Sequence, residues 1–180
     1  MKNILLVFFI FLCCRIKSAE KIKFIGEDIR IFIDSNVVSV FGSYFFRNDS
    51  NQEVLAKIFY PFPIDQYHCY PESIFVEEFV YLKNDSGIDL IMRFKAIGID
   101  TLKIFYRQKL KRNQARYILT TTKNWKIPLQ RANFIIDMPD NLKRIKFSYR
   151  PDSVHYQGMR KSYYITKKDF MPKQDLIIRW

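Results

Sequence analysis

The sequence predicts an all-β fold, an antiparallel β-sandwich of about ten short strands. Three observations support this prediction. Apolar side chains recur at every second residue in most segments after residue 20, which is the spacing of a strand with one buried face. Turn-forming residues separate these segments at intervals of roughly 8 to 14 residues. No long stretch carries an apolar stripe at helical spacing with caps at both ends, so a parallel βαβ architecture is not expected.

The individual strands follow from this alternation. In the first expected strand Ile29, Ile31 and Ile33 fall on one side, and Ser35 and Asn36 then form a tight turn. The expected strands are Glu27–Ser35, Val37–Phe46, Glu53–Tyr60, Ser73–Leu82, Ile88–Lys95, Thr101–Leu110, Ala115–Thr121, Asn133–Asp137, Arg144–Tyr149, Lys161–Ile165 and Asp175–Trp180. The last of these is either the final core strand or an edge strand offered to a partner, and the sequence leaves both open.

Residues that favour turns or end strands mark the boundaries. Pro61 and Pro63 have no backbone N–H to donate, so we expect them to end the third strand. Asn48 and Asn84 each begin an N-x-S sequon, which a eukaryotic secretory pathway could glycosylate. We interpret both sequons as turns, because Asn, Asp and Ser bond to their own backbone.

The N-terminus predicts export. Lys2 precedes an apolar stretch, Ile4–Cys14, and small residues follow at Ser18 and Ala19, which is the order of a secretory signal peptide. We therefore expect residues 1–19 to be a signal peptide and the protein to be secreted or periplasmic. The apolar stretch is shorter than the roughly 20 residues of a spanning helix, so no transmembrane span is expected after its removal. The alternatives are an uncleaved N-terminal membrane anchor, a lipoprotein anchor and a buried first strand.

The amino-acid composition indicates a folded protein and not a disordered one. Of the 180 residues, 48% are hydrophobic and 17% aromatic, which excludes intrinsic disorder. Five glycines are too few for Gly-rich phosphate loops or low-complexity linkers. With no internal repeat and no linker, we expect residues 20–180 to form a single β-sandwich domain.

Removal of the expected signal peptide changes the net charge and the number of cysteines. The formal net charge is +12, and removing Lys2, Arg15 and Lys17 with the signal peptide leaves +9. Cys69 is then the only cysteine, so no intramolecular disulfide can form. We expect Cys69 to be a small buried hydrophobic residue. An intermolecular disulfide and a reactive thiol are the alternatives.

Two segments resemble known β-sandwich families. The strand and turn Tyr44–Ser50, followed by Ala56–Pro63, resembles the start of the vault/inter-alpha-trypsin (VIT) type sandwich, in which an aromatic strand ends in an Asn turn and the next ends in Phe-Pro-Leu-Pro. The chain departs from that pattern at Ile64. A later stretch, Tyr117–Leu129, resembles exported bacterial β-sandwich proteins. The resemblance implies a fold and carries over no catalytic or binding residue.

No pattern in the sequence indicates catalysis or a cofactor. Asp65, His68, Cys69 and Glu72 lie close in sequence, but their spacing matches no established metal site, and we interpret the cluster as chance. A Cys69 nucleophile with His155 as its base would depend entirely on the fold. No carboxylate pair, nucleophile elbow, phosphate loop or zinc-protease motif is present. We therefore predict no catalytic residue, no metal and no cofactor.

A cluster of basic residues gives the clearest indication of function. Strand alternation in Thr101–Leu110 places basic side chains beside Phe105 on one face and apolar ones on the other. The candidate contact residues are Lys103, Arg107, Lys109, Lys111, Arg112 and Arg116. Such a surface would attract an anionic glycan, a lipid surface or an acidic envelope protein, whereas export makes nucleic acid an unexpected partner. The alternative is a solvated face that protects a sheet edge from aggregation.

The function expected from these observations is an exported, non-enzymatic binding or assembly module of the cell envelope that contacts an anionic partner through this basic face. The alternative is a structural subunit that pairs through a β-edge with itself or with a larger envelope protein. A hydrolase is the third hypothesis. The sequence leaves the oligomeric state open.

Overall fold

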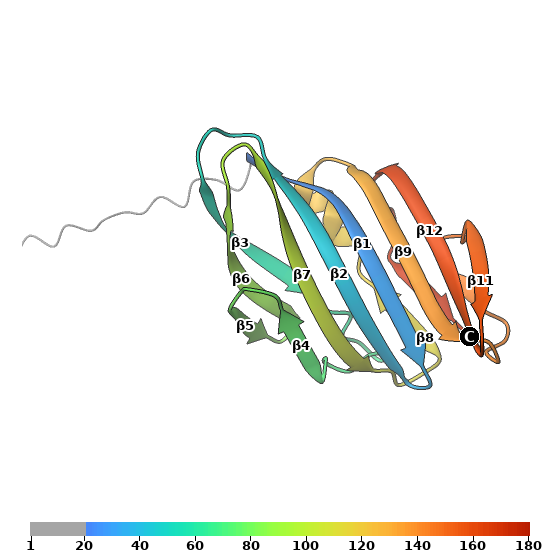
Figure 1. Ribbon diagram of the computed structural model, residues 1–180. Coiled ribbons are helices and arrows are strands. Elements are labelled where there is room, and N and C mark those ends of the chain that lie inside the picture. Colours follow the sequence, from blue (N-terminus) through green and yellow to red (C-terminus); the bar gives the residue numbers. More distant parts are fainter. Residues whose placement is uncertain (1–20) are drawn as a thin grey trace, which may run out of the picture.

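The strands of the protein build three sheets in two layers (Figure 1). The computed structural model describes residues 21–180, so the predicted signal peptide lies outside the described residues. The strands are β1 (Ile22–Asp34), β2 (Val37–Asn48), β3 (Val54–Pro61), β4 (Ser73–Val76), β5 (Tyr81–Asn84), β6 (Gly87–Phe94), β7 (Gly98–Lys109), β8 (Gln114–Tyr117), β9 (Leu129–Pro139), β10 (Lys146–Phe147), β11 (Ser153–Gln157), β12 (Arg160–Phe170) and β13 (Leu176–Arg179). A 3-10 helix, η2 (Thr120–Trp125), follows β8.

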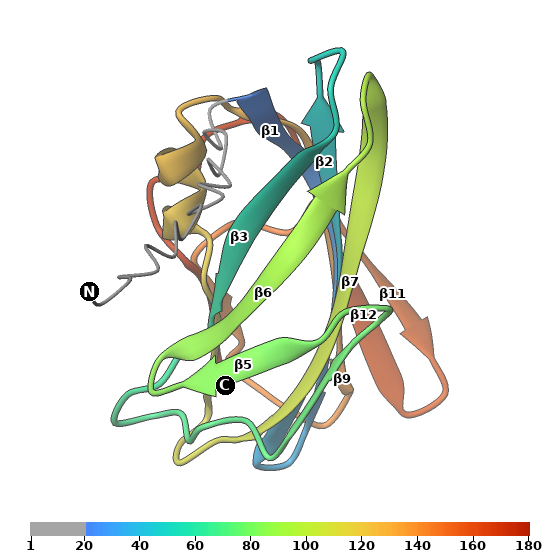
Figure 2. The ribbon, with the colours of Figure 1, turned by 90° about the vertical axis from the view of Figure 1, so that its left-hand side faces the viewer.

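One large sheet packs against two small ones. The large sheet has seven strands in the order β11-β12-β9-β1-β2-β7-β4, and the small sheets have the orders β10-β13-β8 and β3-β6-β5. Figure 2 shows β3, β6 and β5 as a layer beside the long strands β2 and β7. The predicted all-β sandwich is therefore confirmed. One detail was wrong: β1 and β9 pair in parallel, so the large sheet is mixed rather than purely antiparallel.

The core lies between the large sheet and the small sheets. Ile29, Ile31 and Ile33 of β1 are buried, as their predicted alternation requires. Buried side chains from all three sheets form one continuous hydrophobic cluster. The last strand, β13, is the central strand of its sheet and buries Leu176 and Ile178, so it is a core strand and not a free edge.

A bulge in β1 decides which residues enter that core. The pairing with β2 runs from Phe24 opposite Phe46 to Gly26 opposite Phe45, so Ile25 has no partner. An extra residue in one strand reverses its alternation beyond that point. Gly26 is needed here, because a Cβ at this position would lie 2.8 Å from the carbonyl oxygen of Arg131 on β9.

Three predicted strands differ from the structure. Arg144–Tyr149 is reduced to the two residues of β10, Lys146 and Phe147. The expected strand Ser73–Leu82 is broken into β4 and β5, which belong to different sheets, and Glu78 has a left-handed backbone (φ 63°) at the break. The expected strand Ala115–Thr121 ends at Tyr117, where the chain turns into η2. The carboxylate of Asp175 causes this turn, since it accepts hydrogen bonds from the N–H groups of Leu119 and Thr120, both at 3.0 Å.

A further difference is β11, an edge strand of the large sheet that the sequence analysis did not predict (Figure 1). All five of its residues are exposed, and the alternation of Val154 and Tyr156 with polar residues is too short to have indicated a strand. Within residues 21–180, no helix is long and apolar enough to cross a membrane. The single-domain boundary at residues 20–180 stays a prediction.

Candidate functional site

The side of the seven-stranded sheet that faces away from the small sheets, here called the outer face, carries a hollow of about 830 Å³. Side chains from β1, β2, β4, β7, β9 and β12 line it, so the hollow crosses most of the sheet. Because successive side chains of a strand point to opposite faces, most of the lining residues are those that alternate with the core residues.

A row of mostly apolar side chains forms the floor of the hollow. Phe105 of β7 pairs with Phe75 of β4 on one side and with Phe41 of β2 on the other. The ring centroids of Phe41 and Phe105 are 4.6 Å apart. The complete row, in order across the sheet, is Phe75, Phe105, Phe41, Arg30, Ile135 and Tyr164. Phe75 is 61% exposed and Phe41 is 47% exposed, and contiguous exposure of this kind is typical of an interaction site.

Several basic side chains of the outer face are already paired. The ammonium group of Lys103 lies 2.8 Å from the carboxylate of Glu77, and that of Lys109 lies 2.6 Å from Glu72. The hydrogen bond that each lysine donates to its carboxylate raises the pKa of that lysine. Exposed pairs of this kind add little stability. Each one nevertheless cancels a positive charge that an anionic ligand would otherwise meet.

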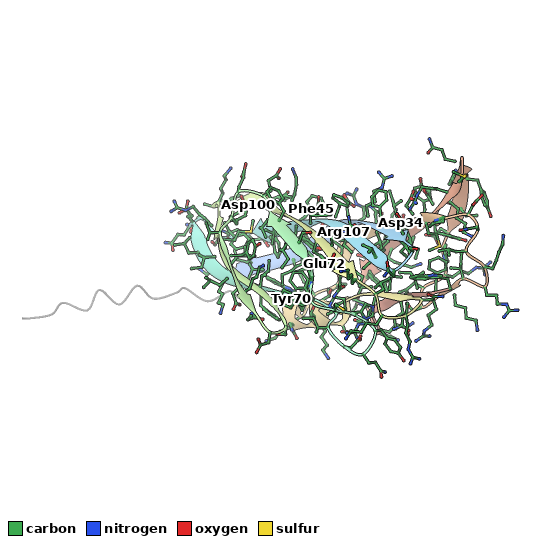
Figure 3. All side chains as sticks on the ribbon, turned by 90° about the horizontal axis from the view of Figure 1, so that it is seen from below. Asp34, Phe45, Tyr70, Glu72, Asp100 and Arg107 are labelled. Carbon is green, nitrogen blue, oxygen red and sulfur yellow. The ribbon has the colours of Figure 1, made fainter. Side chains whose placement is uncertain are left out.

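Arg30 and Arg107 differ from these lysines, because neither forms an ion pair with any of residues 21–180. The guanidinium carbon of Arg30 lies 4.7 Å from the centre of the Phe32 ring. Arg107 lines a second hollow of about 400 Å³ on the same face, together with Asp34. Figure 3 shows Arg107 and Asp34 along the upper side of the molecule, with Tyr70 below them. The outer face therefore combines an apolar floor with the unpaired guanidinium groups of Arg30 and Arg107, and the carboxylates of Asp28 and Glu77 also line the larger hollow.

The structure divides the six predicted contact residues into two groups. Lys103, Arg107 and Lys109 project together from the outer face of β7, as the alternation predicts. The others lie beyond the end of β7. Lys111 donates to the backbone oxygen of Asp65. The guanidinium of Arg112 lies over the ring of Tyr67, and Arg116 of β8 is paired with Asp65 at 3.2 Å. Three of the predicted residues therefore lie on the outer face of β7, and the other three contact residues of the segment around Asp65.

A second polar site lies in the interior. Glu27 of β1 is only 2% exposed, and its Oε2 accepts a hydrogen bond of 2.7 Å from the hydroxyl of Tyr117. The hydroxyls of Tyr117 and Tyr44 are 3.2 Å apart, and those of Tyr44 and Tyr60 are 2.6 Å apart. Glu27 and these tyrosines line a cavity of about 70 Å³. The other carboxylate oxygen of Glu27, Oε1, has no hydrogen-bond partner.

Burial governs the protonation of this interior group. It raises the pKa of Glu27 to about 7, against 4.5 for an ordinary glutamate, and the neighbouring Asp28 adds to the shift while the Tyr117 hydrogen bond opposes it. Burial also raises the pKa of Tyr44, Tyr60 and Tyr117 well above the ordinary tyrosine value. All three phenols therefore stay protonated near neutral pH.

Sequence reasoning missed both Glu27 and Arg30, although a signal for each was present. Glu27 has the same parity as Ile29, Ile31 and Ile33, which places its carboxylate on the buried side. Arg30 has the opposite parity and therefore faces outward. What the sequence does not contain is the distance of either side chain from the residues of other strands.

The two histidines and Cys69 do not form a catalytic pair. His68 is fully buried, and its Nδ1 lies 2.7 Å from the carboxylate of Asp65. His155 lies on β11, with β12, β9, β1 and β2 between it and β7, whose Lys109 carbonyl accepts from the N–H of Cys69. Cys69 is a free thiol that is partly, not fully, buried, so that expectation was wrong. Among residues 21–180 no group of three or more metal-binding side chains is found.

The asparagines of both sequons end strands β2 and β5, and their side chains hold the turns that follow. Asn48 is 1% exposed, and its Oδ1 accepts from the N–H and the hydroxyl of Ser50 at 3.0 and 2.7 Å. Its Nδ2 donates to the carbonyl oxygens of Gln52 and Lys95. Asn84 accepts in the same way from the N–H of Ser86 at 3.0 Å.

Comparison with known proteins extends the description of the fold. A family model described as "Domain of unknown function (DUF4424)" matches residues 99–178. No curated protein matches the chain. Among solved structures, a "putative nutrient binding protein" from Legionella pneumophila is similar with a TM-score of 0.62 and 15% identity, over 88% of this chain and 66% of that one.

An M1 zinc metallopeptidase from Deinococcus radiodurans is similar with a TM-score of 0.53 and 7% identity, over 88% of this chain and 42% of that one. The chain thus spans 66% of the length of the Legionella protein and less than half of the peptidase. At these identities the likeness shows a shared fold. The resemblance to the VIT-type sandwich is not tested by these comparisons and stays a prediction.

Proposed function

We propose that the chain is a non-enzymatic binding module that holds an anionic ligand on the outer face of the seven-stranded sheet. The observation that carries this proposal is the 830 Å³ hollow, whose aromatic floor contains the unpaired Arg30. Arg107, also unpaired, lines the second hollow on the same face. The similarity of fold to a protein described as nutrient binding supports a binding role.

The shape of the surface favours a chain-like ligand. A flat lipid surface cannot reach the floor of a hollow, whereas a polymer can lie along it. Exposed rings such as Phe41 and Phe75 offer flat apolar faces on which sugar rings can pack, while guanidinium groups bind carboxylate or phosphate in a bidentate manner. We therefore propose an acidic polysaccharide of the cell envelope as the ligand class, consistent with the export that the N-terminus predicts.

The test is a binding titration with the purified full chain. Acidic polysaccharide, anionic vesicles and an acidic control protein are each titrated across a salt series. We expect saturable binding to the polysaccharide that weakens steeply with salt, because counterions compete for the arginines. Arg30→Glu and Arg107→Glu should each weaken the binding at least tenfold.

Lys83→Glu is the matched control. Lys83 is exposed on β5, in a different sheet from the outer face, and the substitution makes the same change of charge. We expect this variant to bind within twofold of the unmodified chain. If all three substitutions weakened the binding equally, the binding would depend only on the net charge of the protein. The assignment of the ligand to the outer face would then be overturned. Binding to vesicles or to the acidic protein alone would overturn the ligand class.

A second candidate function rests on β11. This edge strand contains Ser153, Val154, His155, Tyr156 and Gln157, all of them exposed, and lacks the lysine or proline that commonly protects an edge. It could extend the sheet by pairing with a second copy or with a strand of an envelope protein. Dimers that persist at high salt in light scattering would favour this role.

A further inference from the structure

The cavity beside Glu27 is a small aromatic enclosure at the place where the three sheets meet. Its walls include Phe24, Tyr44, Phe46, Tyr60, Tyr117 and Trp125. The ring of Trp125, from η2, lies 5.9 Å from that of Phe24. Figure 2 shows η2 beside the start of β1, with β3 next to it. Residues of β3 and of the η2 segment that are not fully buried, such as Phe59 and Thr121, line the same cavity, so it opens between these elements.

Hydrogen bonds from the tyrosines reach one oxygen of the Glu27 carboxylate. The hydroxyl of Tyr117 donates to Oε2 of Glu27 and also lies within hydrogen-bonding distance of the Tyr44 hydroxyl, at 3.2 Å. In the bond between Tyr44 and Tyr60 either hydroxyl can be the donor. Oε1 of Glu27 receives no proton from any of them.

The unpaired carboxylate oxygen decides what kind of ligand the cavity can hold. Oε1 of Glu27 is a buried acceptor without a partner, and the hydroxyl oxygen of Tyr60 keeps a lone pair. A ligand that meets these groups must therefore donate hydrogen bonds. Its charge should be positive, because it lies against a buried carboxylate.

We propose that this cavity binds the ammonium group of a small primary amine. An alkylammonium is a donor-only cation, and the rings that surround the carboxylate attract a cation through their faces. Size limits the guest further. A water molecule takes up about 30 Å³ in the liquid, so a 70 Å³ cavity accepts two or three heavy atoms. Ethylammonium fits this volume, and tetramethylammonium does not.

The site is independent of the ligand proposed for the outer face. Glu27 points into the core, whereas Arg30 points away from it on the same strand. The titratable groups that face Glu27 are the phenols of Tyr44, Tyr60 and Tyr117, with Asp28 beside it on β1. Failure of either binding proposal therefore leaves the other standing.

The experiment uses the fluorescence of Trp125 in the full chain carrying Trp180→Phe, because the sequence contains two tryptophans. Ethylammonium chloride is titrated at constant ionic strength at pH 8, with ethanol as the uncharged analogue and tetramethylammonium as the oversized cation. We expect a saturable change with ethylammonium alone. Lowering the pH to 6 should weaken the binding about tenfold, since a glutamate with a pKa of about 7 is then mostly protonated.

Glu27→Gln keeps the shape of the side chain and should weaken ethylammonium binding at least tenfold. Asp28→Asn makes the same change of charge on the adjacent residue, whose side chain faces outward, and should stay within twofold. Should Glu27→Gln fail to fold, Tyr60→Phe removes the other acceptor and is expected to weaken binding severalfold. An equal response to ethanol, undiminished binding in Glu27→Gln, or no saturation with ethylammonium would each overturn the proposal.

Discussion

Replacing Glu27 by Gln should change how the free energy of unfolding depends on pH. Burial raises the pKa of this carboxyl to about 7 in the folded protein, against 4.5 for an ordinary glutamate. The folded state therefore binds this proton more tightly than the unfolded chain does. The stabilisation is complete below about pH 4.5 and is lost as the pH rises to about 7, which is the sign for a carboxyl with a raised pKa. At about 1.4 kcal/mol for each pH unit, the loss amounts to about 3 kcal/mol.

The assay is urea-induced unfolding, followed by circular dichroism, between pH 5 and pH 8. We expect the unmodified chain to lose about 2 to 3 kcal/mol across this range relative to Glu27→Gln, which has no carboxyl to titrate. Asp28→Asn keeps the Glu27 carboxyl and should show a somewhat smaller loss than the unmodified chain, because the charge of Asp28 adds to the raised pKa of Glu27. Lys23 lowers the pKa of Asp49, so this carboxyl changes the free energy of unfolding with the opposite sign. Its effect falls below about pH 4, outside the measured range of pH 5 to pH 8.

The refuting result would be a Glu27→Gln variant whose stability stays parallel to that of the unmodified chain from pH 5 to pH 8. Glu27 would then titrate in the folded protein as it does in the unfolded chain, which is incompatible with a carboxylate that is 2% exposed and has one oxygen unpartnered. The interior description of the site would have to be abandoned, and the amine-binding proposal with it.

Three further substitutions test the fold around the sites. Gly26→Ala should cost about 1 to 3 kcal/mol in urea unfolding, because the new methyl group would press on the Arg131 carbonyl oxygen, and a neutral effect would contradict the bulge geometry. Asn48→Ala should cost about 2 to 3 kcal/mol by the same measurement, since it removes a buried group with four hydrogen bonds, and a loss under 1 kcal/mol would show that the turn holds without them. Val154→Lys places a charge on the exposed edge strand β11 and should abolish any salt-resistant dimer in light scattering, whereas a persisting dimer would exclude β11 as the contact.

The fold class was predictable because burial imposes a period of two on every long strand. In β7, Leu102, Ile104 and Tyr106 are buried while Lys103 and Phe105 face outward, as the alternation requires. A strand with one face in the core cannot shift by one residue without exposing its apolar side chains, so the pattern survives in the sequence.

Features set by partners distant in sequence were not predictable. The parallel pairing of β1 with β9 joins residues such as Ile29 and Phe134, and neither strand contains a local sign of its neighbour. The exposed strand β11 has no buried face, and its alternation is limited to Val154 and Tyr156, next to the turn residues Pro151 and Asp152. The break in Ser73–Leu82 depends on the left-handed backbone of Glu78, a conformation that glutamate rarely adopts.

The charge of the candidate site also depends on partners that are distant in the sequence. The lysines of β7 were recognised as a basic face, but their charges are paired with Glu72 and Glu77, which flank β4. Whether a lysine is available to a ligand depends on such pairs, and they form only when β4 pairs with β7. Counting basic residues therefore overstates the positive charge of this surface. The unpaired Arg30 and Arg107 are the better indication of an anionic ligand.

A single irregularity, the bulge at Ile25, positions both of the proposed sites. Without it the alternation that buries Ile22 and Phe24 would continue through Gly26, Asp28 and Arg30, and Glu27 would face outward. The extra residue reverses this order, so that the carboxylate enters the aromatic cavity and the guanidinium enters the outer hollow. Burying the carboxylate of Glu27 costs free energy of folding, so this side chain alone would favour the solvent-exposed side of the strand. The apolar residues Ile29, Ile31 and Ile33 share the parity of Glu27, and their burial holds the carboxylate in the core against that cost.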